Sequence, residues 1–124
     1  MKIGHDSKRL EVLEIRGWVE PSRNEWDRTH WAEKRHAFDS LLWRVIAAYR
    51  KRRRFDRPAR ISIVYYRSGV LPDHDNVAPK MLMDALKRRV IMDDSPNWAG
   101  APTWEVRRAR NRREVRTVVI VTEA

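Results

Sequence analysis

Residues 60–66 read RISIVYY, and this stretch decides how the rest of the chain folds. Most of its residues are β-branched or aromatic, which is the composition of a central strand. A central strand needs strands on both sides and helices over at least one face of its sheet. We therefore look for these elements on either side of residues 60–66.

Two helices are predicted, one before and one after this strand. Apolar residues from position 31 to position 49 recur at three- and four-residue steps, and Thr29 is the expected cap. A second helix is expected over residues 80–89, because Pro79 suits a first helical turn and apolar residues then gather on one side.

The remaining apolar segments predict outer strands. Residues 10–19 alternate between apolar and polar side chains, with apolar positions from Leu10 and Val12 onward. Residues 104–110 and 114–122 are expected to pair as a hairpin. The sequence thus predicts an α/β (α+β) domain spanning 1–124, with a small mixed sheet of about four strands and two main helices in the order β-α-β-α-β-β.

The composition points to a polyanionic partner. Of the 124 residues, 27 are Lys or Arg and 17 are Asp or Glu, which gives a net charge of +10. Nucleic acid is the first candidate for binding such a chain, although the charge alone also suits a merely solubilising surface. There is no cysteine, so thiolate chemistry and disulfides are excluded. We find no apolar run long enough to span a membrane and no secretory signal, so we expect a cytoplasmic protein.

The acidic residues are concentrated in one place. Five of the nine aspartates lie within residues 73–94, a window that has four cations and hence a charge of −1. The remainder of the chain therefore carries +11. A carboxylate cluster on a nucleic-acid-binding protein would repel its ligand unless a divalent cation lies between them, and this predicts a metal site.

Asp73 and Asp75 are the first candidate ligands, because alternate side chains of an extended segment point the same way. The pattern leaves the third carboxylate open between Asp94 and Asp93. Mg²⁺ suits such a site, since it prefers a few carboxylate oxygens, waters and substrate phosphates.

Lys80 and Asp84 lie four residues apart on the second predicted helix. Such a pair can be a surface ion pair, or Lys80 can point into the carboxylate cluster and stabilise charge on a phosphate. Asn76 is expected to brace the loop, and His74 to point outward rather than to bind metal. Trp43 is expected in the core.

Candidate DNA contacts come from two basic segments. One is the run at the end of the first helix, which is either a phosphate-binding corner or a solvated helix end; its members are Arg50, Lys51, Arg52, Arg53 and Arg54. The other comprises Arg28, His30 and Lys34 at the start of that helix, where helix-start packing is the competing interpretation.

Two stretches resemble the RusA family of Holliday junction resolvases. Residues 73–95, DHDNVAPKMLMDALKRRVIMDDS, resemble the family's core motif of D-x-D-N, a lysine, D-A-L and then D-D. Residues 20–35, EPSRNEWDRTHWAEKR, resemble its N-terminal signature of a Pro-Ser-x-Asn turn followed by a basic segment with His and Trp. The resemblance spans most of residues 10–122.

The resemblance implies roles for particular residues. Asp73, Asp75 and Asp94 match the family's metal-binding carboxylates, with Asp93 as the alternate, and Lys80 matches its catalytic lysine; Asn76 and Asp84 would support them. Compared with the usual spacing in the family, one extra residue separates Asp75 from Lys80. This residue falls in the loop before the helix.

What the resemblance implies is a homodimeric endonuclease of bacterial or phage origin that uses Mg²⁺ or Mn²⁺. Such an enzyme resolves four-way DNA junctions by paired phosphodiester hydrolysis in recombination and repair. The competing hypothesis is a basic nucleic-acid-binding protein without catalytic activity, whose aspartates hold a structural cation.

Overall fold

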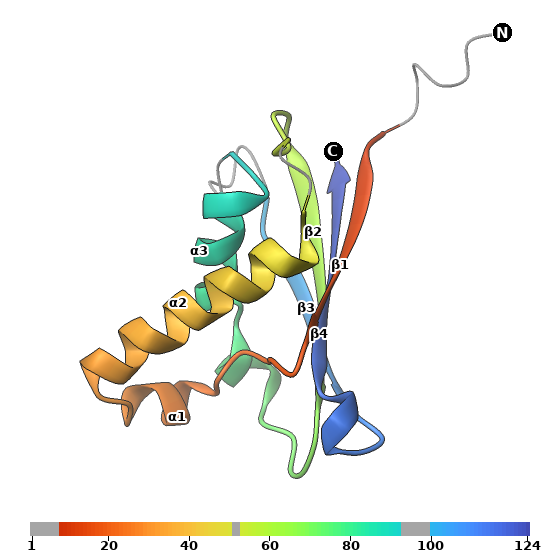
Figure 1. Ribbon diagram of the computed structural model, residues 1–124. Helices are drawn as coiled ribbons and strands as arrows, with labels where there is room; N and C mark the ends of the chain where they lie inside the picture. Colours follow the sequence, from red (N-terminus) through yellow and green to blue (C-terminus); the bar gives the residue numbers. More distant parts are fainter. Residues whose placement is uncertain (1–7, 51–52, 93–99) are drawn as a thin grey trace, which may run out of the picture.

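The computed structural model describes residues 8–50, 53–92 and 100–124. Four strands form one mixed sheet in the order β1-β4-β2-β3 (Figure 1). This confirms the predicted α+β class, with two main helices and the order β-α-β-α-β-β. In chain order, the elements are β1 (Leu10–Arg16), α1 (Arg23–Asp27), α2 (Trp31–Ala48), β2 (Ala59–Arg67), the 3₁₀ helix η2 (His74–Val77), α3 (Lys80–Arg89), β3 (Thr103–Arg108), the 3₁₀ helix η3 (Arg112–Glu114) and β4 (Arg116–Glu123).

The RISIVYY stretch forms the centre of the sheet, as predicted. It lies within β2, which pairs with β4 in antiparallel and with β3 in parallel orientation. Ile61, Ile63 and Tyr65 occupy alternate positions of the strand, and all three lie on its buried face. They form the floor on which the helices pack.

The predicted hairpin of the last two strands is wrong. β4 does not pair with β3 but inserts between β1 and β2, and β3 lies at the edge beyond β2. Val119 of β4 faces Leu13 of β1 on one side and Ile63 of β2 on the other. The apolar β4 thus takes the inner place, and the more charged β3 remains at the edge.

Both main helices cover the same face of the sheet (Figure 1). Leu41 and Val45 of α2 are fully buried, as are Leu82 and Leu86 of α3. Together with the inward side chains of the strands they form one hydrophobic core. None of the described helices has the length and apolar character that crossing a membrane requires.

Three apolar residues lie outside this core, contrary to expectation. Trp43 is 71% exposed, because it lies about 200° around α2 from both Leu41 and Val45. Leu10 and Val12 of β1 are more than half exposed, since the inward residues of this strand are the opposite set that includes Leu13. Val12 and Leu13 are adjacent apolar residues, so the alternation shifts by one position there, and the buried face is the one that carries Leu13 and Ile15.

Candidate functional site

A cleft of about 570 Å³ lies between the two helical parts of the molecule. One wall comes from η2 and the start of α3, and the other from α1 and the first half of α2. Apart from Phe38, the residues of the two walls lie within 20–35 and 73–95, the two stretches that the sequence analysis singled out. The polar residues that line the cleft are Glu20, Arg23, Asp27, Lys34, Arg35, Asp75, Asn76, Lys80 and Asp84.

The charges on the two walls differ. The wall formed by η2 and α3 contributes two carboxylates and one lysine, and Glu20 adds a further carboxylate beside it. The opposite wall contributes Arg23, Lys34 and Arg35 against one acid, Asp27. A phosphodiester strand in this cleft would lie with cations on one side and with carboxylates that can hold a divalent ion on the other.

Asp75 lies on the 3₁₀ helix η2, so the predicted extended course of residues 73–75 is wrong. Residues advance by about 120° each in such a helix, and alternate side chains therefore diverge instead of sharing one side. The Asp75 side chain is 99% exposed and lines the cleft. Asp73 caps η2, accepting a hydrogen bond from the Asn76 amide at 3.0 Å through its carbonyl, and it is not among the described residues that line the cleft.

His74 and Trp104 fix η2 to the edge strand β3. Their rings are stacked with centroids 4.4 Å apart and an interplanar angle of 3°. His74 Nε2 donates to the Trp104 carbonyl at 2.8 Å, and Trp104 Nε1 donates to the His74 carbonyl at 2.9 Å. The stacking and the reciprocal hydrogen bonds hold the backbone next to Asp75, which is a role that the sequence assigned to neither residue.

Trp104→Phe should loosen this attachment while keeping an aromatic ring. Losing the indole N–H leaves the His74 carbonyl without this donor, and we expect a loss of about 1 kcal/mol in the free energy of unfolding. The Asn76 amide should also exchange faster with deuterium, because η2 opens more often. Trp43→Phe, at an exposed position, is the control and should change stability by less than about 0.5 kcal/mol. Equal effects of the two substitutions would contradict this role.

Lys80 reaches the cleft despite the extra residue that precedes it. It is the first residue of α3 and lines the cleft together with Asp75. Among the described residues it forms no ion pair, neither with Asp84 nor with any other acid. The Lys80–Asp84 ion pair, which was the alternative to a functional role, is therefore not formed. The ammonium group of Lys80 can contact a phosphate.

Glu20 is the feature of the cleft that sequence reasoning missed. The residue is 4% exposed, and its carboxylate accepts hydrogen bonds from the backbone amides of Met81 and Leu82 at 3.0 and 3.2 Å. These amides belong to the first turn of α3, where backbone N–H groups have no acceptor within the helix. Glu20 thus fixes the end of α3 that carries Lys80.

Burial raises the pKa of Glu20 from 4.5 to about 7. The hydrogen bonds from the two α3 amides and from the Tyr65 hydroxyl lower it, whereas the negative charge of Asp84 raises it further. Desolvation is the largest cause, because no cation pairs with this carboxylate among the described residues. The cleft therefore contains a carboxyl group that is easily protonated near neutral pH.

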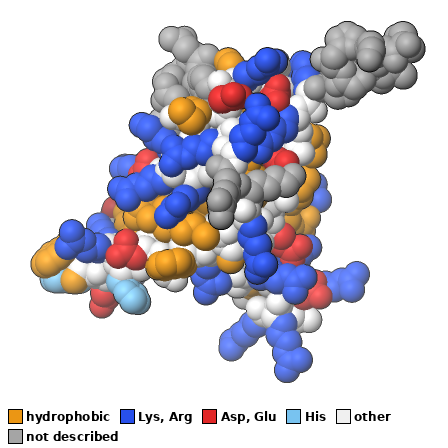
Figure 2. Space-filling model, turned by 45° about the horizontal axis from the view of Figure 1, so that its top comes forward, with side chains coloured by type: hydrophobic (Ala, Val, Ile, Leu, Met, Phe, Trp, Pro, Cys, Tyr) orange, Lys and Arg blue, Asp and Glu red, His pale blue; other side chains and the backbone are white. Residues whose placement is uncertain are grey.

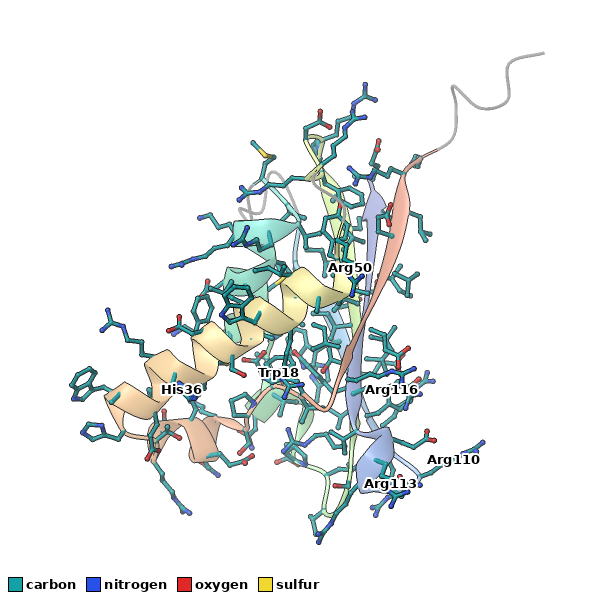
Figure 3. All side chains as sticks on the ribbon, viewed as in Figure 1. Trp18, His36, Arg50, Arg110, Arg113 and Arg116 are labelled. Carbon is teal, nitrogen blue, oxygen red and sulfur yellow. The ribbon has the colours of Figure 1, made fainter. Side chains whose placement is uncertain are left out.

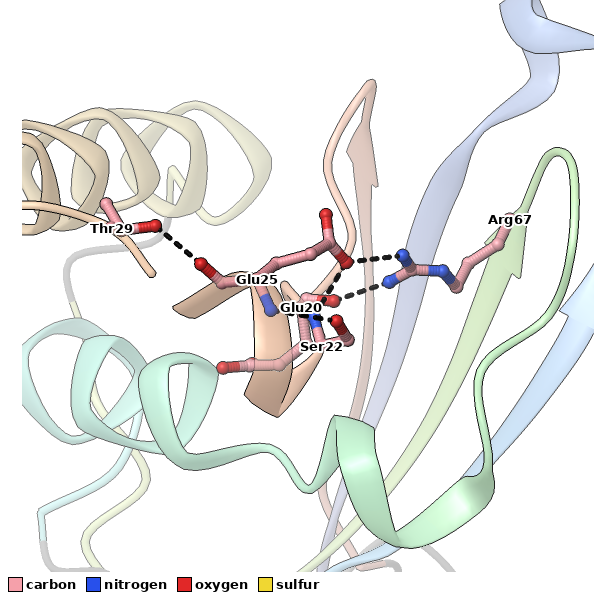
Figure 4. A network of polar contacts seen from close by, with 5 residues as sticks. All are labelled: Glu20, Ser22, Glu25, Thr29 and Arg67. Atoms are coloured by element: carbon pink, nitrogen blue, oxygen red, sulfur yellow. Dashed lines mark hydrogen bonds and ion pairs between the residues drawn. The ribbon is translucent and has the colours of Figure 1, made fainter. Parts of the chain in front are cut away.

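The segment that carries Glu20 is held to the end of β2 by Arg67 (Figure 4). Arg67 donates to the Glu20 carbonyl at 2.6 Å and to the Glu25 carboxylate at 3.2 Å. Glu25 also closes a capping box with Ser22 at the start of α1. The hydrogen bond from Ser22 lowers the pKa of Glu25, with a smaller contribution from Arg67. This network sets the position of the cationic wall relative to the sheet.

The predicted metal ligands lie partly inside and partly outside the described part of the chain. Asp93 and Asp94 lie outside the described residues. Within the described ranges, no three Asp, Glu or His side chains are close enough together to bind one ion. Asp75 and the amide oxygen of Asn76 are nevertheless hard oxygen donors in a solvent-accessible cleft, which suits Mg²⁺ because this ion retains waters and accepts phosphate oxygens.

The predicted DNA-binding residues have different environments. Lys34 lines the cleft, with its ammonium group 5.2 Å from the centre of the Trp26 ring. His30 caps α2 in place of Thr29, accepting a hydrogen bond from the Ala32 amide at 3.2 Å. Arg28 caps the end of α1 and is exposed.

The residues of the basic run after α2 also differ in their environments. Arg53 lies 3.8 Å from Asp56, and Arg54 donates to the Arg88 carbonyl at the end of α3. Arg50 is exposed, and residues 51–52 lie outside the described part. Arg54 lines a groove that adjoins the cleft and shares Phe38 and Asp84 with it.

Three cleft residues had no distinguishing signal in the sequence. Glu20 adjoins Pro21 in a turn and looks like any surface acid there. Arg23 and Arg35 belong to a chain with many arginines, so charge alone does not single them out. These three residues could be assigned to the site only by knowing that residues 20–35 and 73–95 face each other across one cleft.

No protein-family model matches the chain, and no curated protein matches it.

Proposed function

We propose that this protein is a metal-dependent DNA endonuclease that resolves four-way junctions, as the resemblance to the RusA family implies. The observation that carries the proposal is the meeting of Asp75 and Lys80 in one cleft, opposite the cations Arg23, Lys34 and Arg35. A carboxylate for a metal ion and a lysine without an ion-pair partner among the described residues can assist phosphodiester hydrolysis, and a cationic wall can hold the DNA strand.

Each wall has its own task in this proposal. Asp75, with Asp94 as a further proposed ligand, would hold Mg²⁺ or Mn²⁺, and Asn76 would brace the loop that presents Asp75. The ion, when bound, supplies positive charge to the phosphate and activates water as the nucleophile. Lys80 stabilises the negative charge that develops on the phosphate oxygens.

The cationic wall binds the DNA backbone. Arg23, Lys34 and Arg35 would contact phosphates next to the one that is cut, which holds the strand against the carboxylate wall. Further cations lie outside the cleft, and Figure 3 shows Arg110 and Arg113 projecting from the end of the molecule near η3. Contacts of this kind depend strongly on salt and little on base sequence.

We further propose that the enzyme acts as a homodimer in recombination and repair. A four-way junction has two symmetric strands to cut, and two sites related by two-fold symmetry would match it. Sedimentation velocity at micromolar concentration, with and without a junction, measures the oligomeric state directly. The proposal predicts a dimer on the junction, and a stable monomer there would contradict it.

The cleavage experiment compares substrates of the same sequence. A labelled four-way junction, a flap, a linear duplex and a single strand are each incubated with the protein at low salt, with Mg²⁺, with Mn²⁺ and with EDTA. We expect paired nicks in the junction that require a divalent ion, and much slower cutting of the linear duplex. An intact junction under all these conditions would overturn the proposal.

A further inference from the structure

A second groove continues from the cleft along the boundary between α2 and α3. Phe38 and Asp84 line both hollows, so the groove begins where the cleft ends. It extends toward the end of α3, past Leu42 of α2 and Met92 beyond α3. The cleft and the groove therefore form one continuous path on the surface.

The groove has cationic sides. Lys87, Arg88 and Arg89 line it from the last turn of α3, Arg54 lines it from the segment before β2, and Asp84 is the one acid among its described lining residues. Cations in the last turn of a helix also suit the helix dipole, so charge alone does not establish a binding site. Arg54 comes from another segment, however, and donates to the Arg88 carbonyl, which brings a further cation to the same place.

The groove also has an apolar floor. Met92 is 52% exposed, and Phe38 and Leu42 are half-buried. The Arg88 guanidinium lies 5.2 Å from the centre of the Phe38 ring, so a cation and an aromatic face are already paired. Figure 2 shows Lys and Arg side chains gathered above hydrophobic side chains on the left of the molecule, where α3 lies above α2.

Cationic sides over an apolar floor favour one class of occupant. A DNA duplex presents phosphates while its base faces are stacked inside, so it would leave the floor uncovered. A single strand presents phosphates and base faces together, and its bases can stack on an aromatic side chain such as Phe38 and pack against apolar ones such as Leu42 and Met92. Lys80 in the cleft and Lys87 in the groove are about 10 Å apart along α3, which corresponds to roughly three nucleotides of one strand.

We propose that this groove binds a single-stranded DNA segment that leaves the cleft, with its phosphates on the α3 cations and Arg54 and its bases on Phe38, Leu42 and Met92. That this strand is part of the DNA being cut rests on the proposed function. The groove itself rests on the lining residues, and DNA binding can be measured without cleavage.

The absence of cysteine from the chain allows a direct test. Met92→Cys places a single thiol in the groove, and Val12→Cys places one at a similarly exposed position on the uncovered face of the sheet. Each variant is labelled with a photoactivated cross-linker and mixed with a single-stranded 20-mer or with the matching duplex. We expect at least about fivefold more cross-linking from position 92 than from position 12, and more to the single strand than to the duplex.

Salt dependence gives a second readout. Arg89→Gln should reduce the slope of log affinity against log salt for the single strand by about 0.7, because one phosphate contact is lost. Arg60→Gln, an exposed arginine on the outer side of β2, should leave this slope nearly unchanged. Equal slopes for the two variants would count against the groove.

The outcomes separate the two proposals. Equal cross-linking from positions 92 and 12, or preferential cross-linking to the duplex, would overturn the proposal that the groove binds single-stranded DNA, even if the protein cuts junctions. Strong cross-linking from position 92 by a protein that cuts no junction would support the groove and overturn the proposed function. Within a junction, the cross-links should map about two to five nucleotides from the cut.

Discussion

Asp75→Asn should abolish junction cleavage while DNA binding persists. Replacing the carboxylate with an amide removes the proposed charged metal ligand and keeps the shape of the side chain. We expect the cleavage rate to fall by about a thousandfold or more. The dissociation constant for the junction should stay within a few-fold or decrease, because one negative charge is removed from the path of the phosphates. Single-turnover cleavage and fluorescence anisotropy measure the two quantities.

The matched control is Asp27→Asn. Asp27 lines the same cleft from the opposite wall, and the proposal gives it no ligand role. Its substitution should leave the cleavage rate within a few-fold of the wild-type value. If Asp75→Asn retained full activity, or if both variants lost activity equally, Asp75 would not be the ligand. Junction binding without cleavage by any form of the protein would favour the competing non-catalytic hypothesis.

The stability of the metal-free protein should fall as the pH rises from about 4.5 to about 7, because of Glu20. In the unfolded chain this carboxyl group ionises near pH 4.5, whereas in the folded protein its pKa is about 7. The folded state therefore retains a proton that unfolding releases, and this contribution is complete below pH 4.5 and lost as the pH passes 7. The difference corresponds to about 3 kcal/mol.

Glu20→Gln isolates this contribution. The glutamine stays neutral, so the unfolding free energy of the variant should depend less on pH between 4.5 and 7, by about the same 3 kcal/mol. The variant should also be about 1–2 kcal/mol less stable than the wild type at pH 4.5, because its single oxygen cannot accept from both the Met81 and Leu82 amides as the carboxyl group does. Urea unfolding at several pH values measures both effects. Parallel curves for the two proteins would contradict the raised pKa.

The central part of the fold could be predicted because its signals are local. RISIVYY has both the composition and the alternation of a strand, and α2 and α3 each repeat apolar residues at helical spacing. The order of strands in the sheet could not be predicted in the same way. It depends on which strands are apolar enough to have a neighbouring strand along both edges. The short connection around η3 looks like a hairpin, although it leads past β2.

The candidate site was predictable in its motifs but not in its geometry. The resemblance and the charge distribution selected Asp75 and Lys80, and the structure places both in one cleft. The D-x-D spacing suggested an extended segment, whereas His74 pairs with Trp104 and the backbone turns into η2. Glu20 could not be found from sequence, because its role depends on reaching the amides of α3 about 60 residues later.

The measurement that tests the central claim most directly is anomalous diffraction from crystals of the protein soaked in Mn²⁺. The account predicts an anomalous peak within about 2.5 Å of an Asp75 carboxylate oxygen, on the side of the cleft that Lys80 also lines, and no such peak in Asp75→Asn crystals. An Mn²⁺ ion bound elsewhere on the molecule, with nothing at Asp75 under saturating conditions, would contradict it.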